Sequence, residues 1–236
     1  MPPKTGKNEE SREKSRAALL RAGADLLVEH ALQNPFAALR LRAICERAGY
    51  STGAFYLHWA SVDEYYNALA ELLAAEDQDN ADFATLEEIA ESSADASALT
   101  AIARVSDRDF QTLVGSSLYD AGELLNLTWG RTHLRSQIAH RYQMWDQATG
   151  QLYEKILASR GREPRPPLDW DRIGTILQGL IEGLGLRHKV DPIAASASSE
   201  PESGLYAKAV AALLAVLTRP VGDNASLEEA IQALLP

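Results

Sequence analysis

Apolar residues recur every three or four positions through much of this chain, which is the spacing of one face of an α-helix. The first such stretch runs from about Ser11 to Ala31 and predicts one long helix. A shorter stretch follows, with apolar positions at Leu41, Ile44, Cys45 and Ala48. Gly49 then stands where a residue with positive φ commonly ends a helix. These patterns predict two helices with a tight turn after the second.

A third, short helix is predicted directly after this turn, up to Trp59. Ser51 carries a hydroxyl that can accept from the unpaired N–H groups at a helix start. Phe55 and Trp59 lie four positions apart, so both can face the core. The residues left on or near the outer face are Thr52, Gly53 and Tyr56. Because small residues let a helix approach base edges in the major groove, residues 40–66 predict a helix-turn-helix reader of DNA.

The rest of the chain predicts a larger helical body. Ser61 can cap the next helix, with Glu64 three residues later as the second member of a capping box. Residues 161–167, GREPRPP, interrupt the helical pattern, and residues 191–203 are poor in bulky apolar groups and predict a flexible loop. The helices expected in this body cover residues 61–79, 132–158, 170–188, 205–217 and 227–235.

Two of these helices, 170–188 and 205–217, offer more apolar surface than their neighbours in one chain readily cover. A homodimer would cover it, and three glycines on the first helix, Gly179, Gly183 and Gly185, would permit close approach there. The alternative is that both helices belong to the core of a single chain. A two-fold DNA reader favours the homodimer.

Composition agrees with an all-α chain of more than one domain. The 236 residues exceed the roughly 100–200 of an average domain, and strand-forming patterns are sparse. The formal net charge is -10, which is unusual for a DNA-binding protein. Residues 1–60, however, carry nine Lys and Arg against six acidic residues, so this segment is at +3 and the remainder at -13. The basic end is the one expected to meet phosphate.

Other sequence features limit the expected location and the expected class of function. The single cysteine suits a reducing compartment and no apolar run is long enough to span a bilayer, so a cytoplasmic location is expected. Residues 1–10 mix proline, glycine and charged residues and are expected to form a disordered basic arm. There is no Gly-rich phosphate loop, G-x-S-x-G, HExxH or CxxC, so neither catalysis nor a metal or cofactor is expected.

Residues 40–66 resemble the DNA-binding domain of TetR-type transcriptional regulators, and the resemblance extends over about residues 11–75. Three positions depart from the family pattern: Arg40 stands for a capping Thr, Cys45 for Ala and Val62 for a phosphate-contacting Lys. A longer connection, residues 33–36, also replaces the usual glycine turn. The matching residues are Leu41, Ile44, Ala48, Gly49, Ser51, Gly53, Phe55, Tyr56, His58, Trp59, Ser61 and Tyr65.

The resemblance implies a division of the chain and a set of DNA contacts. An N-terminal helix-turn-helix domain (11–60) would precede a ligand-binding and dimerisation domain (61–236) that begins with a connecting helix, 61–79. Thr52 and Ala54 are the expected base-edge readers, and Arg40 and Arg42 are expected to touch phosphate. By resemblance Tyr56 and His58 also contact phosphate, although either could instead pack against the first helix. The full set expected at DNA is Arg40, Arg42, Ser51, Thr52, Gly53, Ala54, Tyr56 and His58.

The resemblance also places an inducer pocket among aromatic residues of the body. Any one of them is more often core than ligand contact, so the expectation applies to the group. The residues are Phe110, Tyr119, Trp129, Tyr142 and Trp145. The expected function is a ligand-responsive repressor that binds a palindromic operator as a homodimer through helices 170–188 and 205–217. The alternative is a helical ligand-binding or interaction module that has weak or lost DNA binding. Val62, in place of a phosphate-contacting Lys, and the altered connection are the reasons for considering it.

Overall fold

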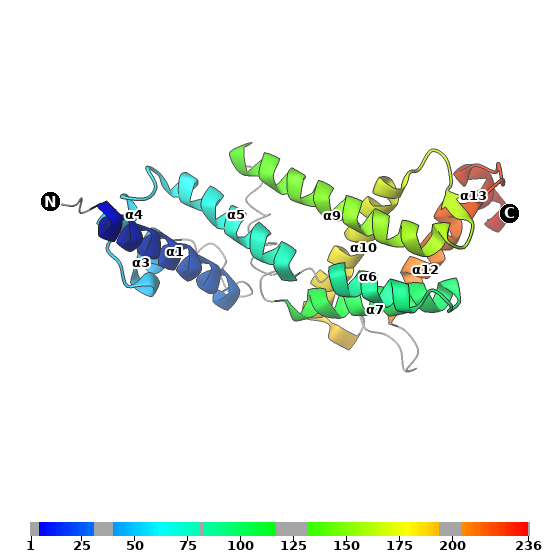
Figure 1. Ribbon diagram of the computed structural model, residues 1–236, viewed down its shortest axis with the longest axis horizontal. Coiled ribbons are helices and arrows are strands. Elements are labelled where there is room, and N and C mark those ends of the chain that lie inside the picture. Colours follow the sequence, from blue (N-terminus) through cyan, green and yellow to red (C-terminus); the bar gives the residue numbers. More distant parts are fainter. Residues whose placement is uncertain (1–4, 31–39, 81–82, 117–131, 194–203, 236) are drawn as a thin grey trace. The chain divides into compact units, whose positions relative to one another are not determined.

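The computed structural model describes residues 5–30, 40–80, 83–116, 132–193 and 204–235, which are helical apart from turns and one two-stranded sheet (Figure 1). The expected all-α fold is confirmed. The helices are α1 (Thr5–His30), α3 (Leu41–Ala48), α4 (Thr52–Phe55), α5 (Val62–Asn80), α6 (Phe83–Ser92), α7 (Ala98–Gly115), α9 (Thr132–Ala158), α10 (Trp170–Val190), α12 (Leu205–Leu217) and α13 (Leu227–Leu234).

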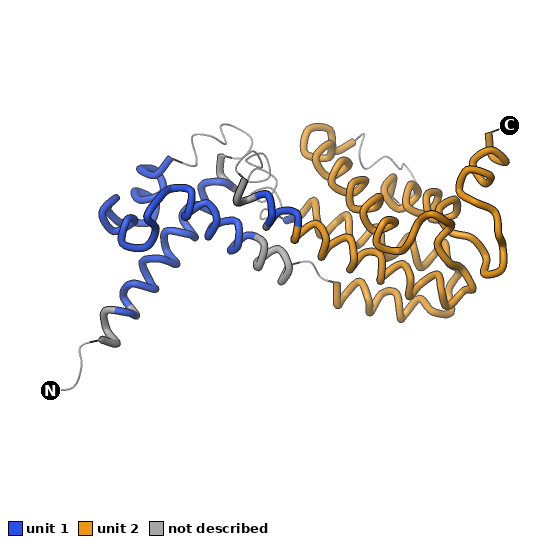
Figure 2. The backbone as a smooth tube through the Cα atoms, turned by 90° about the horizontal axis from the view of Figure 1, so that it is seen from above, with its two compact units in different colours: residues 1–80, 116–139 blue, residues 81–115, 140–236 orange. Residues whose placement is uncertain are grey.

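The chain divides into two compact units (Figure 2). The first comprises residues 1–80 and 116–139, and the second residues 81–115 and 140–236. The boundary at residue 60 that the sequence suggests differs from this division because α5 packs into the first unit, where Tyr65 and Leu69 are fully buried. None of the described helices is long and apolar enough to cross a membrane.

The first helix begins earlier than the sequence pattern suggests. Residues 1–10 were expected to be a disordered arm, but α1 starts at Thr5, so the expectation is wrong for residues 5–10. After Gly6 this segment holds Lys, Asn and two Glu and no proline, and Lys and Glu are good helix formers that extend α1 by more than a turn. Residues 1–4, and the connection at 33–36, lie outside the described residues.

The turn after α3 follows the expected chemistry. Gly49 takes a left-handed φ of 74°, and the N–H groups of Gly49 and Tyr50 donate to the carbonyl oxygens of Glu46 and Cys45. These bonds satisfy carbonyls at the helix end that would otherwise lack partners. Cys45 is buried, as expected for a small apolar side chain.

An aromatic core holds the first unit together. The Tyr65 ring lies edge-on to Trp59, with 5.0 Å between ring centroids, and 5.2 Å from Phe55. The Tyr65 hydroxyl donates to the Leu19 carbonyl at 2.9 Å, which ties α5 to α1. Gly23 lies against this hydroxyl, where a larger side chain would collide with it. These rings fix α4 against α1 and α5 from within.

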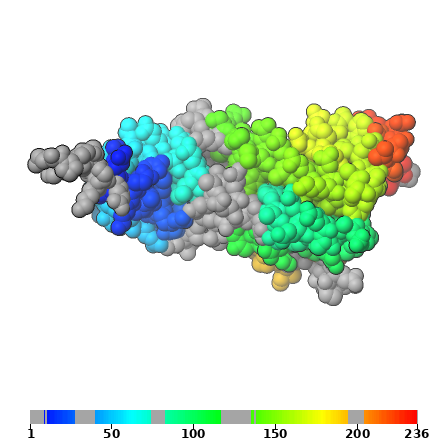
Figure 3. Space-filling view, in the orientation of Figure 1, coloured from blue at the N-terminus to red at the C-terminus, as the bar shows by residue number. Residues whose placement is uncertain are grey.

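In the second unit α9 and α10 are in backbone contact. A Cβ atom at Gly174 would collide with the Asp146 carbonyl, and one at Gly150 would collide with the Trp170 carbonyl. Within the chain the close approach thus occurs at Gly150 and Gly174. Gly179 and Gly183, two of the three glycines expected at a dimer contact, have open space where a Cβ would stand, and that expectation stays a prediction. On the face shown in Figure 3, α6 lies beside α9, and Glu87 pairs with the Lys155 ammonium at 2.5 Å.

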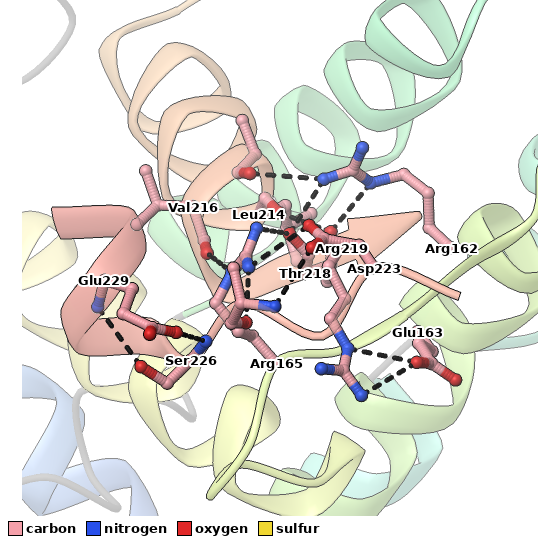
Figure 4. Close-up of polar contacts among 12 residues, drawn as sticks. Arg162, Glu163, Arg165, Leu214, Val216, Thr218, Arg219, Asp223, Ser226 and Glu229 are labelled. Carbon is pink, nitrogen blue, oxygen red and sulfur yellow. Dashed lines mark hydrogen bonds and ion pairs between the residues drawn. The ribbon is translucent and has the colours of Figure 1, made fainter. Parts of the chain in front are cut away.

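Residues 161–167 contain a strand that the sequence pattern did not indicate. β1 (Arg162–Pro164) pairs antiparallel with β2 (Thr218–Pro220), and Glu163 lies opposite Arg219. The side chain of Arg165, directly after β1, is buried and donates to the carbonyls of Val216 (3.2 Å) and Ala225 (2.6 Å) (Figure 4).

Arg162 caps the C-terminal end of α12, the helix end to which Arg165 also donates. Its guanidinium donates to the carbonyls of Ala215 (3.2 Å) and Thr218 (2.9 Å). Two cations therefore meet the carbonyl end of α12, where the helix dipole favours positive charge. Together these bonds join α12 to β1 and to the segment leading into α13.

Candidate nucleic-acid interface

The reading helix α4 is capped as the sequence suggests but is shorter. The Ser51 hydroxyl accepts from the Ala54 N–H at 3.2 Å. Beyond Phe55 the N–H groups of Leu57 and His58 donate three residues back, to Ala54 and Phe55, so the expected helix tightens into a turn before Trp59. The result is a single helical turn whose first residues, with the Ser51 cap, are exposed.

The two faces of α4 differ sharply. Phe55 and Trp59 are buried, and they hold the turn in the aromatic core. Ser51, Thr52 and Gly53 are exposed, and a Cβ at Gly53 would meet only the Ser51 hydroxyl, at 3.6 Å. The start of α4 therefore presents a hydroxyl, a bare backbone and little bulk, which is what close approach to base edges requires.

Tyr56 lies on this outer surface. Its side chain is half exposed (53%), and its ring meets Phe55 edge-on at 5.3 Å. The phenol is thus held by one core contact while its hydroxyl can reach a neighbouring molecule. The phosphate contact expected of Tyr56 stays a prediction.

His58 is held by the first helix. Its Nε2 lies 2.7 Å from the Ser15 hydroxyl, and Arg12 donates to the adjacent Leu57 carbonyl at 2.6 Å. Burial, together with the guanidiniums of Arg12 and Arg16, keeps the pKa of His58 below its ordinary value of 6.5. A neutral imidazole bonded to Ser15 matches the alternative that His58 packs against the first helix. Arg12 and Ser15 lie more than 40 residues away in sequence, so no local pattern signals their role.

The basic residues before the turn are exposed. Arg40 is the N-cap residue of α3 and makes no side-chain cap. The Arg42 Nε donates to the Glu46 carboxylate at 2.7 Å, on a side chain that is 87% exposed. Exposed pairs of this kind contribute little to stability, so the guanidinium can exchange Glu46 for phosphate at little cost.

The aromatic residues expected in the inducer pocket have different ring neighbours, and the pocket stays a prediction. Trp145 contacts the ring of Phe83 at 5.9 Å, whereas Phe110 stacks on Tyr206 at 5.7 Å. Tyr142 is half-buried, with the Arg141 guanidinium 5.6 Å from its ring centroid. The two remaining residues of the expected set, Tyr119 and Trp129, lie outside the described residues.

Polar residues beside Phe110 were not singled out from the sequence. On α7, Ser106 lies 2.8 Å from the hydroxyl of Tyr153, and both residues are fully buried. Burial raises the pKa of Asp109, one turn further along, to about 7. Their side chains come together only because α7, α9 and α12 pack with these faces inward, which spacing along one helix does not reveal.

Comparison with known proteins agrees with this geometry. Residues 19–69 match the family described as bacterial regulatory proteins, tetR family. No curated protein matches the sequence.

Solved structures share the fold at low identity. One from Rhodococcus sp., assigned to the TetR-family transcriptional regulators, is 19% identical with a TM-score of 0.53, over 87% of this chain and 98% of its own. A transcriptional regulator structure from Saccharomonospora viridis in complex with choline is 16% identical (TM-score 0.56; 86% and 96%). SmeT, the repressor of the Stenotrophomonas maltophilia multidrug efflux pump SmeDEF, is 18% identical (TM-score 0.50; 89% and 96%).

These matches cover the segment that forms α1, α3, α4 and the start of α5, and the fold extends through the larger helical unit. The resemblance drawn from residues 40–66 is thereby confirmed: the chain carries the DNA-binding domain of the tetR family of bacterial regulatory proteins and has the fold of TetR-type transcriptional regulators.

Proposed function

We propose that this protein is a sequence-specific transcriptional repressor that binds a palindromic operator as a homodimer and releases it when a small molecule binds the body. The observation that carries the proposal is the asymmetry of α4. Its inner face is locked into an aromatic core by Phe55 and Trp59, and its outer face leaves Thr52 and Gly53 bare. The exposed outer face of this turn does not contribute to packing of the core, and its small residues suit the major groove.

The exposed face of α10 supports the homodimer. Ile176, Leu186 and Val190 are exposed on one side of this helix, with Gly179 and Gly183 between them. The spacing of three, four, three and four residues is that of a helix packing seam. The opposite side of α10 is buried within the unit, so the stripe is available to a second copy. Two reading helices in such a dimer would have to reach successive major grooves, about 34–36 Å apart.

Leu186→Glu should therefore convert the dimer into a monomer, because a charge in the seam would be left unpaired on association. Light scattering at micromolar concentration measures this directly. Leu99→Glu is the matched control, since Leu99 on α7 is as exposed (64%) as Leu186 (63%) but lies outside the seam. A dimer that survives Leu186→Glu, or is lost equally in both variants, would contradict this interface.

Operator binding tests the reader itself. Selection from a random duplex library should yield a palindromic site, and Thr52→Ala should then relax the preference at one position of each half-site by about 1–3 kcal/mol. Arg42→Ala should instead weaken all sequences alike and reduce the salt dependence by about one phosphate contact. Uniform loss in both variants would mean that the reading face is elsewhere. No enrichment even at low salt would favour the alternative, a helical module without DNA binding.

A response to a ligand is supported by the neighbours that share the fold, one of them solved with choline and another a repressor of an efflux pump. In this chain α5 continues directly from the reader and leads into the second unit. A ligand that shifts α5 would change the separation of the two readers. It can release DNA only by as much as it prefers the released state, typically about 1–3 kcal/mol.

A further inference from the structure

A group of polar side chains in the second unit lacks the partners that burial demands. The Tyr206 side chain is buried, yet its hydroxyl, which lies near Asp109 and Tyr153, makes no hydrogen bond of good geometry, and the buried Nδ1 of His188 is unpartnered. Buried polar atoms are nearly always satisfied in folded proteins, so two orphans in one place point to something that binds there. Both residues contact the ring of Phe110, with centroid distances of 5.7 and 5.8 Å.

A carboxylate lies beside these orphans. Asp109 is adjacent to Phe110 on α7. Burial raises the pKa of the Tyr153 and Tyr206 phenols, and the nearby Asp109 carboxylate raises both further. Asp109 forms no ion pair within the described residues, and burial raises its pKa to about 7. An acid in this setting is poorly stabilised when ionised and would gain most from a cation.

Four helices supply what we call the Asp109 cluster. The members come from α7, α9, α10 and α12. Ser106, Tyr153 and Tyr206 are fully buried, whereas Asp109, Phe110 and His188 are half-buried. The half-buried members are partly open to solvent, and the fully buried members supply hydroxyls. The members are Ser106, Asp109, Phe110, Tyr153, His188 and Tyr206.

We propose that the Asp109 cluster binds the protonated amine of a small molecule whose apolar part lies against Phe110. The ammonium would neutralise Asp109 and donate to the Tyr206 hydroxyl. A neutral alcohol could pair with the orphans but would leave Asp109 without a counter-charge, and a carboxylate would be repelled. The inference rests on the proposed function, because it names the chemical class of the ligand to which the body responds.

The test uses the full-length protein and two probes of the same shape, 2-phenylethylamine and 2-phenylethanol, with calorimetry at pH 7.5. The amine should bind saturably and at least tenfold more tightly than the alcohol. Asp109→Asn should weaken the amine at least tenfold and leave the alcohol unchanged, and Glu154→Gln, at an exposed acid on α9, should change neither. Equal binding of the two probes, absence of saturable amine binding, or full amine affinity in Asp109→Asn would overturn the proposal.

A second variant guards against a folding defect. Tyr206→Phe removes only the unpartnered hydroxyl, so the fold should persist, as thermal melting can show, and the amine should bind several-fold more weakly. Unchanged amine affinity in a folded Tyr206→Phe would contradict the assigned role of this hydroxyl.

Operator affinity measured with and without the amine separates this proposal from the proposed function. Amine binding that requires Asp109 but leaves operator affinity unchanged would uphold the amine site and refute the ligand response. Intact operator binding with no amine recognition at Asp109 would refute the amine site and leave the proposed operator binding standing.

Discussion

Gly174→Ala should lower the free energy of unfolding of the second unit by about 2–3 kcal/mol, because the added methyl group would collide with the Asp146 carbonyl of α9. That carbonyl belongs to a helix backbone and cannot rotate away, so the two helices would have to separate. Gly150, on the other side of the crossing, faces the Trp170 carbonyl in the same way. Urea unfolding followed by circular dichroism measures the loss.

Gly179→Ala, on the same helix, provides the matched control when both glycine substitutions are made in the monomeric Leu186→Glu background, because Gly179 lies in the proposed dimer seam. No atom lies within 4 Å of the position of its Cβ, so the substitution should stabilise the protein by up to about 1 kcal/mol through helix propensity alone. The same substitution at two positions of α10 should thus have opposite signs. A loss at both positions, or at neither, would contradict the backbone contact at Gly174.

Arg165→Ala should destabilise the C-terminal part of the second unit by about 2–4 kcal/mol, since it leaves at least two partly buried carbonyl acceptors without a donor. The guanidinium contacts the carbonyls of Val216 and Ala225 and lies 3.4 Å from the Asp223 carboxylate. Its loss should free α13 from the end of α12. Thermal melting and protease cleavage after α12 would show the effect.

Arg172→Ala is the comparison for Arg165. Arg172 is largely exposed and pairs with Asp169 at 3.8 Å, so its loss should cost about 1 kcal/mol or less. Equal effects of the two substitutions would mean that burial of Arg165 is not what stabilises the helix end.

Local chemistry accounts for what the sequence reveals of this fold. The helix stop at Gly49 and the cap at Ser51 depend on residues within three or four positions of each other, and both are found as expected. At Ser61 the expected box is shifted, because Glu64 accepts from the N–H of Ala60 while its own N–H donates to Ser61. The apolar spacing likewise locates α10 and α12 to within two residues.

Contacts between distant segments account for what the sequence does not reveal. β1 pairs with β2 across more than fifty residues, and His58 bonds Ser15 on another helix. The rotation of each helix about its axis is equally hidden. Spacing alone does not reveal that α9 and α10 meet at Gly150 and Gly174, nor which rings Phe110 and Trp145 contact. The packing of the helices sets Phe110 against Tyr206 and Trp145 against Phe83.

The two faces of α4 have a consequence for how such a protein can change over generations. Phe55 and Trp59 carry the folding of this segment, while Thr52 and Gly53 contribute almost nothing to the core. Mutations on the outer face are therefore nearly free of a stability penalty, and selection can act there on DNA preference alone. A duplicated gene could acquire a new operator by substitutions within a single helical turn, while the rest of the domain stays as it is.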